Sequence, residues 1–464
     1  MNRSDLIQAM AGIVGEDNLI TSEEELICYL YNAGPRRPSQ FMPALAVAPE
    51  TTEQVAAILR YADEHVIPVI PRGQASGLSE NTRIEQPDTI MLSMTKFKKL
   101  EIDPETLTAT VGAGVVTSDI KNAAAGHGLL YPPDPASFTY STIGGNVSTD
   151  AGGLQCVKYG TTKSYVAGLT VVLPSGEIIR TGGKCIKDVT GYNLTQLITG
   201  SEGTLGIVTE VILKLVPRPE GRKAMRVIFN DLDNAARAIS AIMVSGVVPS
   251  TMEFMDNYFI RAVEEVIQAG FPTDAACMLL IEVDGPLNTL DGQTEAITAV
   301  CNGLGAAEVR IAGNDEEAEE LWKARRLSLN ALSRKAKSRL SGDPAAPINR
   351  LPQCLAKLKE LEQEYGIVIT TYGHAGDGNL HPCFLFNTPE EKEKAMQARN
   401  AFYEYVVTIG GTVSAEHGVG REKIKYIEQQ LGRPQLALMA GIKKVFDPNN
   451  ILNPGCVLGE YLHG

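Results

Sequence analysis

Several features that define common protein classes are scarce or missing in this sequence. No apolar run approaches the roughly 20 residues of a membrane-spanning helix. The first ten residues, MNRSDLIQAM, lack the apolar core and the small-residue cleavage site of a signal peptide. The net charge of −13 over 464 residues disfavours the positive field that non-specific nucleic-acid binding requires. We therefore expect a cytoplasmic protein with no transmembrane segment and no nucleic-acid partner.

Clustered cysteines are also missing. The eight cysteines are scattered along the chain, whereas iron–sulfur clusters and structural zinc sites need closely spaced thiols. Isolated free thiols are typical of a reducing compartment.

The common nucleotide and hydrolase motifs are incomplete. The stretches Gly112–Thr117 and Gly303–Glu308 lack the third glycine of a dinucleotide-binding fingerprint, and Gly183-Lys184 lacks the earlier glycine of a P-loop. No Gly-x-Ser-x-Gly elbow is present. These absences disfavour a nicotinamide-dependent Rossmann enzyme, a P-loop NTPase and an α/β-hydrolase.

Histidine is rare, yet its distribution is informative. The chain has six histidines, and two short windows near the C-terminus hold His374, His381 and the adjacent pair Glu416-His417. Neutral imidazoles and a carboxylate are ligands that a borderline divalent metal prefers. A single histidine of this kind is more often an ordinary polar loop residue, but two glycine-flanked groups together indicate a metal or proton-transfer site.

The first half of the chain contains the patterns of a mixed α/β fold. The expected elements are two short helices in the first forty residues, a strand at Leu45–Ala48, a helix from a Thr51/Gln54 capping box to about His65, a strand at Val66–Ile70, and a helix capped at Thr117 or Ser118.

Three loops rich in glycine and hydroxyl residues accompany these elements. They are Pro71–Ser79, Tyr131–Gly160 and the stretch from Gly191, with its Ser201–Gly206 turn before a strand at Ile207–Leu215. Without a Cβ, glycine lets backbone amides approach phosphate oxygens closely. The first loop alone could be an ordinary tight turn, but three such loops favour one extended cofactor that carries a polyphosphate.

From about Arg222 the chain changes to alternating strands and acidic helices. A helix expected at Glu316–Lys337 carries Arg325 on its apolar face. A buried arginine needs an anionic partner. A structural Glu or Asp and a bound carboxylate both remain open as that partner.

Taken together, the motifs resemble a known family. PRGQASGLS, PPDPAS, IGGNVSTDAGG, GSEGTLGIVTE, GHAGDGNLHP, SAEHGVGREK and FDPNNILNPG are similar to those of the vanillyl-alcohol oxidase and p-cresol methylhydroxylase superfamily. Within it, the chain resembles the D-2-hydroxyacid dehydrogenase branch, which contains D-lactate dehydrogenases and the D subunits of glycolate oxidases. The match spans almost the whole chain.

The resemblance implies an α+β architecture in four parts. These are an N-terminal helical segment at 1–39, a two-subdomain FAD-binding domain at 40–217, a ferredoxin-like substrate cap at 218–410, and a C-terminal segment at 411–464 that returns to the flavin.

The resemblance also implies noncovalent FAD, because no histidine occurs in the loops that would carry a covalent link. The implied cofactor-binding residues are Arg72, Gly73, Gln74, Ala75, Ser76, Gly77 and Ser79 at the pyrophosphate, Pro135, Gly144, Gly145, Ser148, Gly153 and Tyr159 along the flavin, Glu202, Gly206 and Ile207 towards the adenine, and Asn453. Gln74 and Ala75 replace two glycines of the family pattern, which changes the expected loop geometry.

By the same analogy, a divalent metal (zinc, iron or manganese) would be held by His374, His381 and Glu416. Arg325 would pair with the substrate carboxylate, and His417 would be the general base. The implied reaction is oxidation of a small D-2-hydroxyacid, with D-lactate ahead of glycolate. Electrons would pass to a partner protein, either an electron-transferring flavoprotein or an iron–sulfur subunit. The alternatives are an aryl-alcohol or alkyl-glycerone-type enzyme, and a non-catalytic flavoprotein of the same fold.

Overall fold

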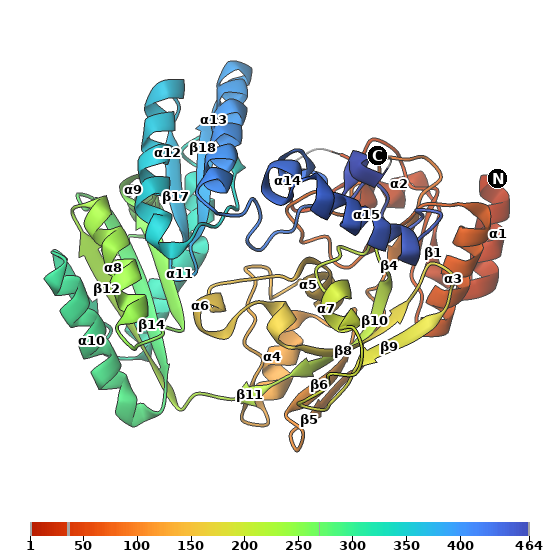
Figure 1. Ribbon diagram of the computed structural model, residues 1–464, viewed down its shortest axis with the longest axis horizontal. Helices are drawn as coiled ribbons and strands as arrows, with labels where there is room; N and C mark the ends of the chain where they lie inside the picture. Colours follow the sequence, from red (N-terminus) through yellow and green to blue (C-terminus); the bar gives the residue numbers. More distant parts are fainter. Residues whose placement is uncertain (1, 35–37, 269, 463–464) are drawn as a thin grey trace. The chain divides into compact units, whose positions relative to one another are not determined.

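The computed structural model of the chain describes residues 2–34, 38–268 and 270–462, apart from the side chains at 324 and 327–330. The chain forms two compact units (Figure 1). Unit 1 comprises residues 1–152, 161–218 and 416–464, and unit 2 comprises residues 153–160 and 219–415.

The first sheet of unit 1 has four strands in the order β1-β2-β4-β3. The strands β2, β3 and β4 are parallel, and β1 is antiparallel to β2. The helix between β2 and β3, α3, has the expected capping box at Thr51 and Gln54. Its buried face packs with the first helix, α1, in one apolar cluster. The bounds are α1 Arg3–Val14, β1 Leu19–Ile20, α2 Glu23–Leu26, β2 Leu45–Val47, α3 Thr52–His65, β3 Val69–Arg72 and β4 Ile90–Ser93.

One strand begins later than the sequence suggested. Val66 is the C-cap of α3 in the left-handed conformation, with φ 53°, so β3 begins only at Val69. A β-branched residue rarely adopts this conformation, and the apolar pattern Val66–Ile70 therefore read as a continuous strand.

The second sheet of unit 1 is antiparallel, in the order β5-β6-β10-β8-β9. The helix α4 begins at Thr117, but its N-cap is Val116, and the hydroxyl of Thr117 donates instead to Ser141 O. The expected side-chain cap at Thr117 or Ser118 is thus wrong, because a tertiary contact takes the hydroxyl. The bounds are β5 Leu100–Asp103, β6 Thr108–Gly112, α4 Thr117–Ala125, β7 Leu129–Leu130, α5 Ile143–Thr149, β8 Val166–Val172, β9 Ile178–Gly182, α7 Leu194–Ile198, β10 Ile207–Lys214 and β11 Val216–Pro217.

Unit 2 is built on a seven-stranded antiparallel sheet, in the order β15-β12-β14-β13-β17-β18-β16. Both faces of the sheet are covered, because one apolar cluster contains side chains of α8, α10, α12 and α13 and another contains those of α9 and α11. The bounds are α6 Cys156–Tyr159, β12 Gly221–Phe229, α8 Leu232–Val244, β13 Thr251–Asp256, α9 Asn257–Ile267, β14 Cys277–Gly285, α10 Leu290–Gly303, β15 Glu308–Ile311, α11 Asp315–Leu332, β16 Ser338–Ser341, α12 Leu351–Tyr365, β17 Ile369–His374, β18 Asn379–Phe386 and α13 Pro389–Thr408.

The helix α11 ends five residues before its expected end at Lys337. Turn hydrogen bonds from Arg334 N to Ala331 O and from Lys335 N to Leu332 O close it, and β16 follows from Ser338.

The C-terminal segment of unit 1 contains α14 (Ile424–Leu431) and α15 (Arg433–Phe446) before it reaches the first sheet. There Val69 N donates to Ile451 O and Asn453 N donates to Val69 O, at 2.8 and 2.9 Å. The end of the chain is therefore joined to the strand that leads into the first glycine-rich loop.

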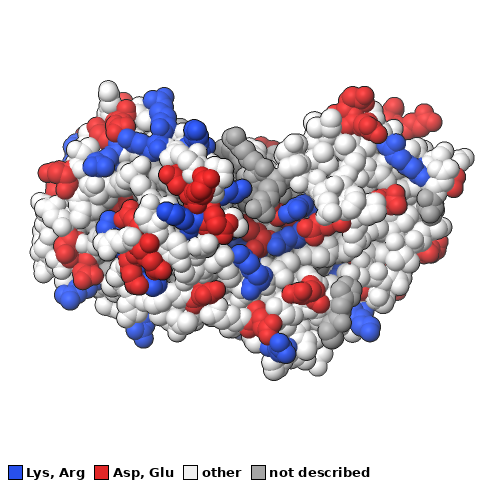
Figure 2. Space-filling view, turned by 90° about the horizontal axis from the view of Figure 1, so that it is seen from above, with Lys and Arg blue, Asp and Glu red and all other residues white. Residues whose placement is uncertain are grey.

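Among the described residues, every helix is too short or too polar to cross a bilayer. Acidic and basic side chains are interspersed over the face in Figure 2. All eight cysteines are free.

Candidate active site

The hairpin of β17 and β18 brings His374 and His381 together. Its register pairs His374 with Asn379 and Tyr372 with His381. Cross-strand partners point to the same side of a sheet, as do residues two apart along one strand. Both histidines therefore lie on one face, with ring centroids 5.1 Å apart and an edge-to-face arrangement.

His374 is oriented by a buried carboxylate. Glu253 lies opposite it on β13, and His374 Nδ1 is 2.5 Å from Glu253 Oε1. A carboxylate accepts the proton of Nδ1 and leaves the lone pair on Nε2, the arrangement typical of metal-binding histidines. Burial by itself raises the pKa of the Glu253 carboxyl, but His374 and Arg325 outweigh it and lower that pKa.

Arg325 on α11 shares this carboxylate. Its Nε donates to Glu253 Oε2 at 2.8 Å, and its guanidinium lies 4.7 Å from the centroid of the Tyr372 ring. The structural carboxylate that the sequence left open as a partner of Arg325 is therefore present.

His381 and Asp343 form the next part of the site, and Asp343 is hydrogen-bonded to the last residues of unit 2. His381 Nδ1 donates to Gly342 O at 3.3 Å, which again leaves the lone pair on Nε2. Asp343 is 1% exposed and accepts hydrogen bonds from Asn379 Nδ2 and Ser414 Oγ. Its carbonyl accepts from Ala415 N at 2.9 Å, and Glu416 and His417 follow directly in the chain.

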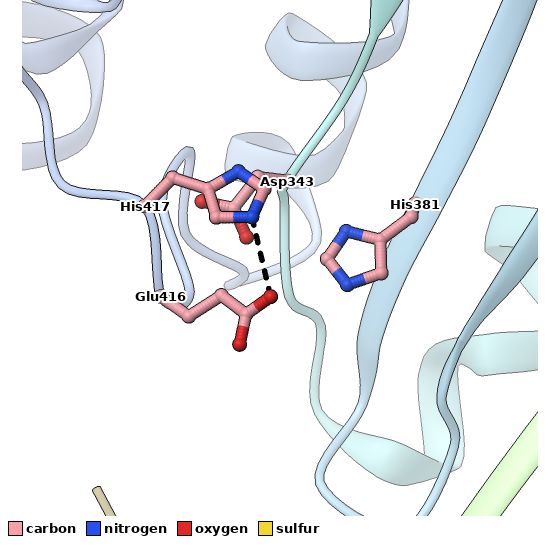
Figure 3. A group of neighbouring side chains, drawn as sticks. All are labelled: Asp343, His381, Glu416 and His417. Carbon is pink, nitrogen blue, oxygen red and sulfur yellow. Dashed lines mark ion pairs between the residues drawn. The ribbon is translucent and has the colours of Figure 1, made fainter. Parts of the chain in front are cut away.

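Asp343, His381, Glu416 and His417 form a group of possible metal ligands (Figure 3). One ligand atom of each residue lies within 4.8 Å of the others, and His417 Nε2 is 3.2 Å from Glu416 Oε1. Three of the residues singled out in the sequence meet here, while His374 is beside His381 and hydrogen-bonded to Glu253. Two imidazoles and two carboxylates fit a borderline divalent cation.

The sequence reasoning missed Asp343 and Glu253. Glu253 had a usable signal, because it interrupts the apolar strand Thr251–Asp256 and a buried charge needs a partner. Asp343 lies in a Gly-Asp-Pro turn after β16, and nothing in that turn distinguishes it from an ordinary loop aspartate.

In unit 1, the first glycine-rich loop follows β3 directly. Among the described residues, none accepts a hydrogen bond from the backbone amides of residues 74–77. Ala75 has a φ of 52°, the left-handed conformation that the glycine of the family pattern would adopt more readily than alanine does. Successive unpaired amides in such a turn form a concave site for an anion, and this fits the pyrophosphate of FAD.

The other two glycine-rich loops meet the first one. A Cβ on Gly73 would lie 2.2 Å from Thr142 Oγ1, so the first and second loops touch there. Glu202 N donates to Ser148 O at 2.7 Å, and this joins the second loop to the third. Asn453 Nδ2 donates to Glu202 O at 2.8 Å. Direct contacts within unit 1 therefore join the three loops and the C-terminal segment.

The remaining predicted cofactor residues are dispersed around these loops. Arg72 donates to Cys28 O and Tyr29 O. Gln74 and Gly145 are exposed, Ser76, Gly77 and Gly144 are half-buried, and Ser79, Pro135, Gly206 and Ile207 are buried. Gly153 and Tyr159 belong to unit 2, where Tyr159 Oη donates to Asp284 Oδ2 at 2.6 Å.

Comparison with known families decides the identity of this scaffold. The FAD binding domain family matches residues 43–182, and the family of FAD linked oxidases, C-terminal domain, matches residues 218–457. The chain belongs to the FAD-linked oxidases. It is therefore an FAD-dependent oxidoreductase, which confirms the resemblance found in the motifs.

Relatives of this FAD-linked oxidase match it over nearly its full length. Glycolate oxidase subunit GlcD of Bacillus subtilis (strain 168) is 41% identical over 98% of this chain and 97% of the relative. The D-lactate dehydrogenase of Anaerostipes hadrus is 35% identical over 89% of each chain.

Solved structures confirm the fold class. p-Cresol methylhydroxylase with substrate bound superposes with a TM-score of 0.79 at 21% identity, over 97% of this chain and 96% of that chain. 4-Ethylphenol oxidase from Gulosibacter chungangensis gives 0.76 at 19% identity, over 97% and 96%. At these identities the likeness concerns the fold alone. The expected α+β architecture of the p-cresol methylhydroxylase type is confirmed.

Proposed function

We propose that this FAD-linked oxidase converts a small D-2-hydroxyacid into the 2-oxoacid, with D-lactate preferred and glycolate next. The observation that carries the proposal is the pair His374/His381 on one face of the hairpin. Both Nδ1 atoms are hydrogen-bonded, so that the lone pair of each ring lies on Nε2. The names of the relatives, glycolate oxidase subunit and D-lactate dehydrogenase, favour this substrate class.

FAD, bound noncovalently, supplies the acceptor for the two electrons and the hydrogen on C2 of the substrate. The amides of the Pro71–Ser79 loop bind the pyrophosphate, with Arg72 close by. The second loop lines the flavin through Pro135, Gly144, Gly145 and Ser148, together with Gly153 and Tyr159. Gly206, Ile207 and Asn453 lie towards the adenine, and Glu202 stands in the turn before them.

His374, His381 and Glu416 hold a divalent metal, and Asp343 offers a further carboxylate. The metal supplies a positive charge that lowers the pKa of the substrate hydroxyl. Zinc, iron and manganese all accept this donor set.

Arg325 and His417 complete the site. Arg325 binds the substrate carboxylate, and its Nε bond to Glu253 keeps the guanidinium in one orientation. His417 accepts the proton of the substrate hydroxyl, a step that needs a base with a pKa near neutral.

The parts of the chain divide these tasks. Residues 40–217 bind FAD, residues 218–410 form the substrate cap, and residues 411–464 return the base to the flavin, while the helix α1 packs against α3. Electrons leave for a partner protein in the cytoplasm, an electron-transferring flavoprotein before an iron–sulfur subunit.

Anaerobic titration of the FAD-loaded protein tests the proposal. D-Lactate should bleach the flavin absorbance stoichiometrically, glycolate more slowly, and L-lactate and an aryl alcohol not at all. Bleaching by the aryl alcohol alone would indicate an aryl-alcohol-type enzyme instead. If none of the four compounds bleaches the flavin, the chain is a non-catalytic flavoprotein.

A further inference from the structure

Glu202 occupies an unusual place in unit 1. It lies in the turn between α7 and β10 and is 5% exposed. Its φ is 53°, a left-handed conformation that is uncommon for a non-glycine residue and that costs free energy. A buried acid in a strained conformation needs partners that compensate for both.

These partners come from the loop after His417. Glu202 Oε1 accepts from Val419 N at 2.7 Å and from Gly420 N at 3.2 Å, and Oε2 lies 3.0 Å from Gly420 N. The Asn81 amide and the Cys456 thiol also donate to Oε2. Among the described residues, each partner of the carboxylate is thus a hydrogen-bond donor, and two of the donating amides lie two and three residues beyond His417.

The same loop is held from its other side by the first glycine-rich loop. Ser79 Oγ donates to Gly418 O at 2.9 Å, and Ser79 O accepts from Arg421 N at 3.0 Å. Gly418 leaves little room, because a Cβ there would lie 2.7 Å from Glu202 Oε1.

We propose that Glu202 is a positioning residue. Its carboxylate binds the backbone of the loop at residues 418–420, a contact called the clasp below, and thereby fixes His417. It does not bind the adenine of FAD. This inference rests on the proposed function only for the role of His417. The clasp itself lies within unit 1.

Hydrogen–deuterium exchange measures the clasp without substrate. In FAD-loaded Glu202→Ala, peptides that contain the amides of Val419 and Gly420 should exchange at least tenfold faster, because both amides lose their acceptor. The FAD dissociation constant should change less than threefold. Glu210→Gln on β10, whose carboxylate pairs with the exposed Lys99, is the matched control and should leave this exchange unchanged.

Glu202→Gln serves if the alanine variant does not fold. It keeps the volume but replaces one acceptor oxygen by a donor, so exchange should rise in the same direction by a smaller factor. Unchanged exchange in a folded variant would overturn the clasp. Loss of FAD affinity without faster exchange would also overturn it, in favour of adenine binding.

A double-mutant cycle then tests the link to catalysis. Glu202→Ala should slow flavin reduction with the substrate dissociation constant unchanged, and it should add little to the loss in His417→Asn, since both changes act on one group. If the rate losses of the two single variants multiply in the double variant, Glu202 does not position His417. If His417→Asn alone has no effect, the assigned base is wrong, and the exchange measurement still decides the clasp.

Discussion

Glu202 and Glu253 are both buried carboxylates, but their partners differ. Glu253 faces a guanidinium and a histidine, which overcome the effect of burial and lower its pKa. Glu202 faces mainly neutral donors, so burial dominates and raises its pKa. The ionised Glu253 keeps the proton of His374 on Nδ1, and the lone pair of the ring thus lies on Nε2, as the proposed metal site requires.

His381→Ala should remove the metal and most of the turnover while FAD remains bound, because the substitution deletes one ligand of the cation and leaves unit 1 unchanged. Metal analysis and flavin absorbance of the purified variant measure both properties. The exposed His127 gives the control His127→Ala, which should retain metal and activity. A normal kcat in His381→Ala after treatment with a chelator would contradict the metal assignment.

His417→Asn should keep metal and flavin but slow flavin reduction by roughly 100-fold or more, the usual size of the loss of a general base. Stopped-flow absorbance gives the rate. Reduction at the wild-type rate would move the proton acceptor to another residue.

At the scale of elements, short turns and loops set the positions of the site residues. The turn at residues 375–378 sets the register that places both histidines on one face. The loop at residues 416–421 requires glycine at position 420. Gly420 has a φ of 57°, and a Cβ there would lie 1.6 Å from Ser79 O. Backbone geometry thus decides where Glu416 and His417 lie.

Gly420→Ala should disrupt this loop, whereas Gly410→Ala should only strain the backbone. Both glycines have positive φ, but a Cβ on Gly410 would have open space within 4 Å. We expect Gly410→Ala to cost about 1–2 kcal/mol, the left-handed penalty alone, and Gly420→Ala to cost more and also to slow flavin reduction. Thermal unfolding and stopped-flow reduction compare the two. Equal effects on both properties would show that the contact with Ser79 does not matter.

At the scale of the whole molecule, the FAD-binding unit is assembled from three separate stretches of chain. This discontinuity brings the C-terminal segment, with Glu416 and His417, into the same unit as the glycine-rich loops. The sequence has no complete dinucleotide fingerprint and no clustered cysteines, and for this reason the proposed function includes a partner protein that takes the electrons.

The proposed transfer of electrons to a partner protein predicts that the purified chain turns over D-lactate with an artificial dye but only slowly with NAD or oxygen. Steady-state rates with each acceptor, measured at equal FAD content, check this expectation. Rapid turnover with oxygen or NAD would exclude the need for a partner.

The sequence by itself determined the family, the fold class and most of the elements. Its glycine-rich loops, its capping box at Thr51 and its histidine windows are local patterns, and local patterns can be read from residue order because neighbouring residues produce them.

Only the tertiary structure decided which groups meet. Glu253 lies 121 residues from His374, and Glu202 lies 217 from Val419, so no spacing rule could pair them. Asp343 joins His381 because β16 adds to the edge of the sheet beside β18. Val66 is not part of β3 because it forms the C-cap of α3. In the first three cases long-range packing brings together residues that no local pattern pairs, whereas at Val66 hydrogen bonds to Ala62 O and Asp63 O end the helix locally.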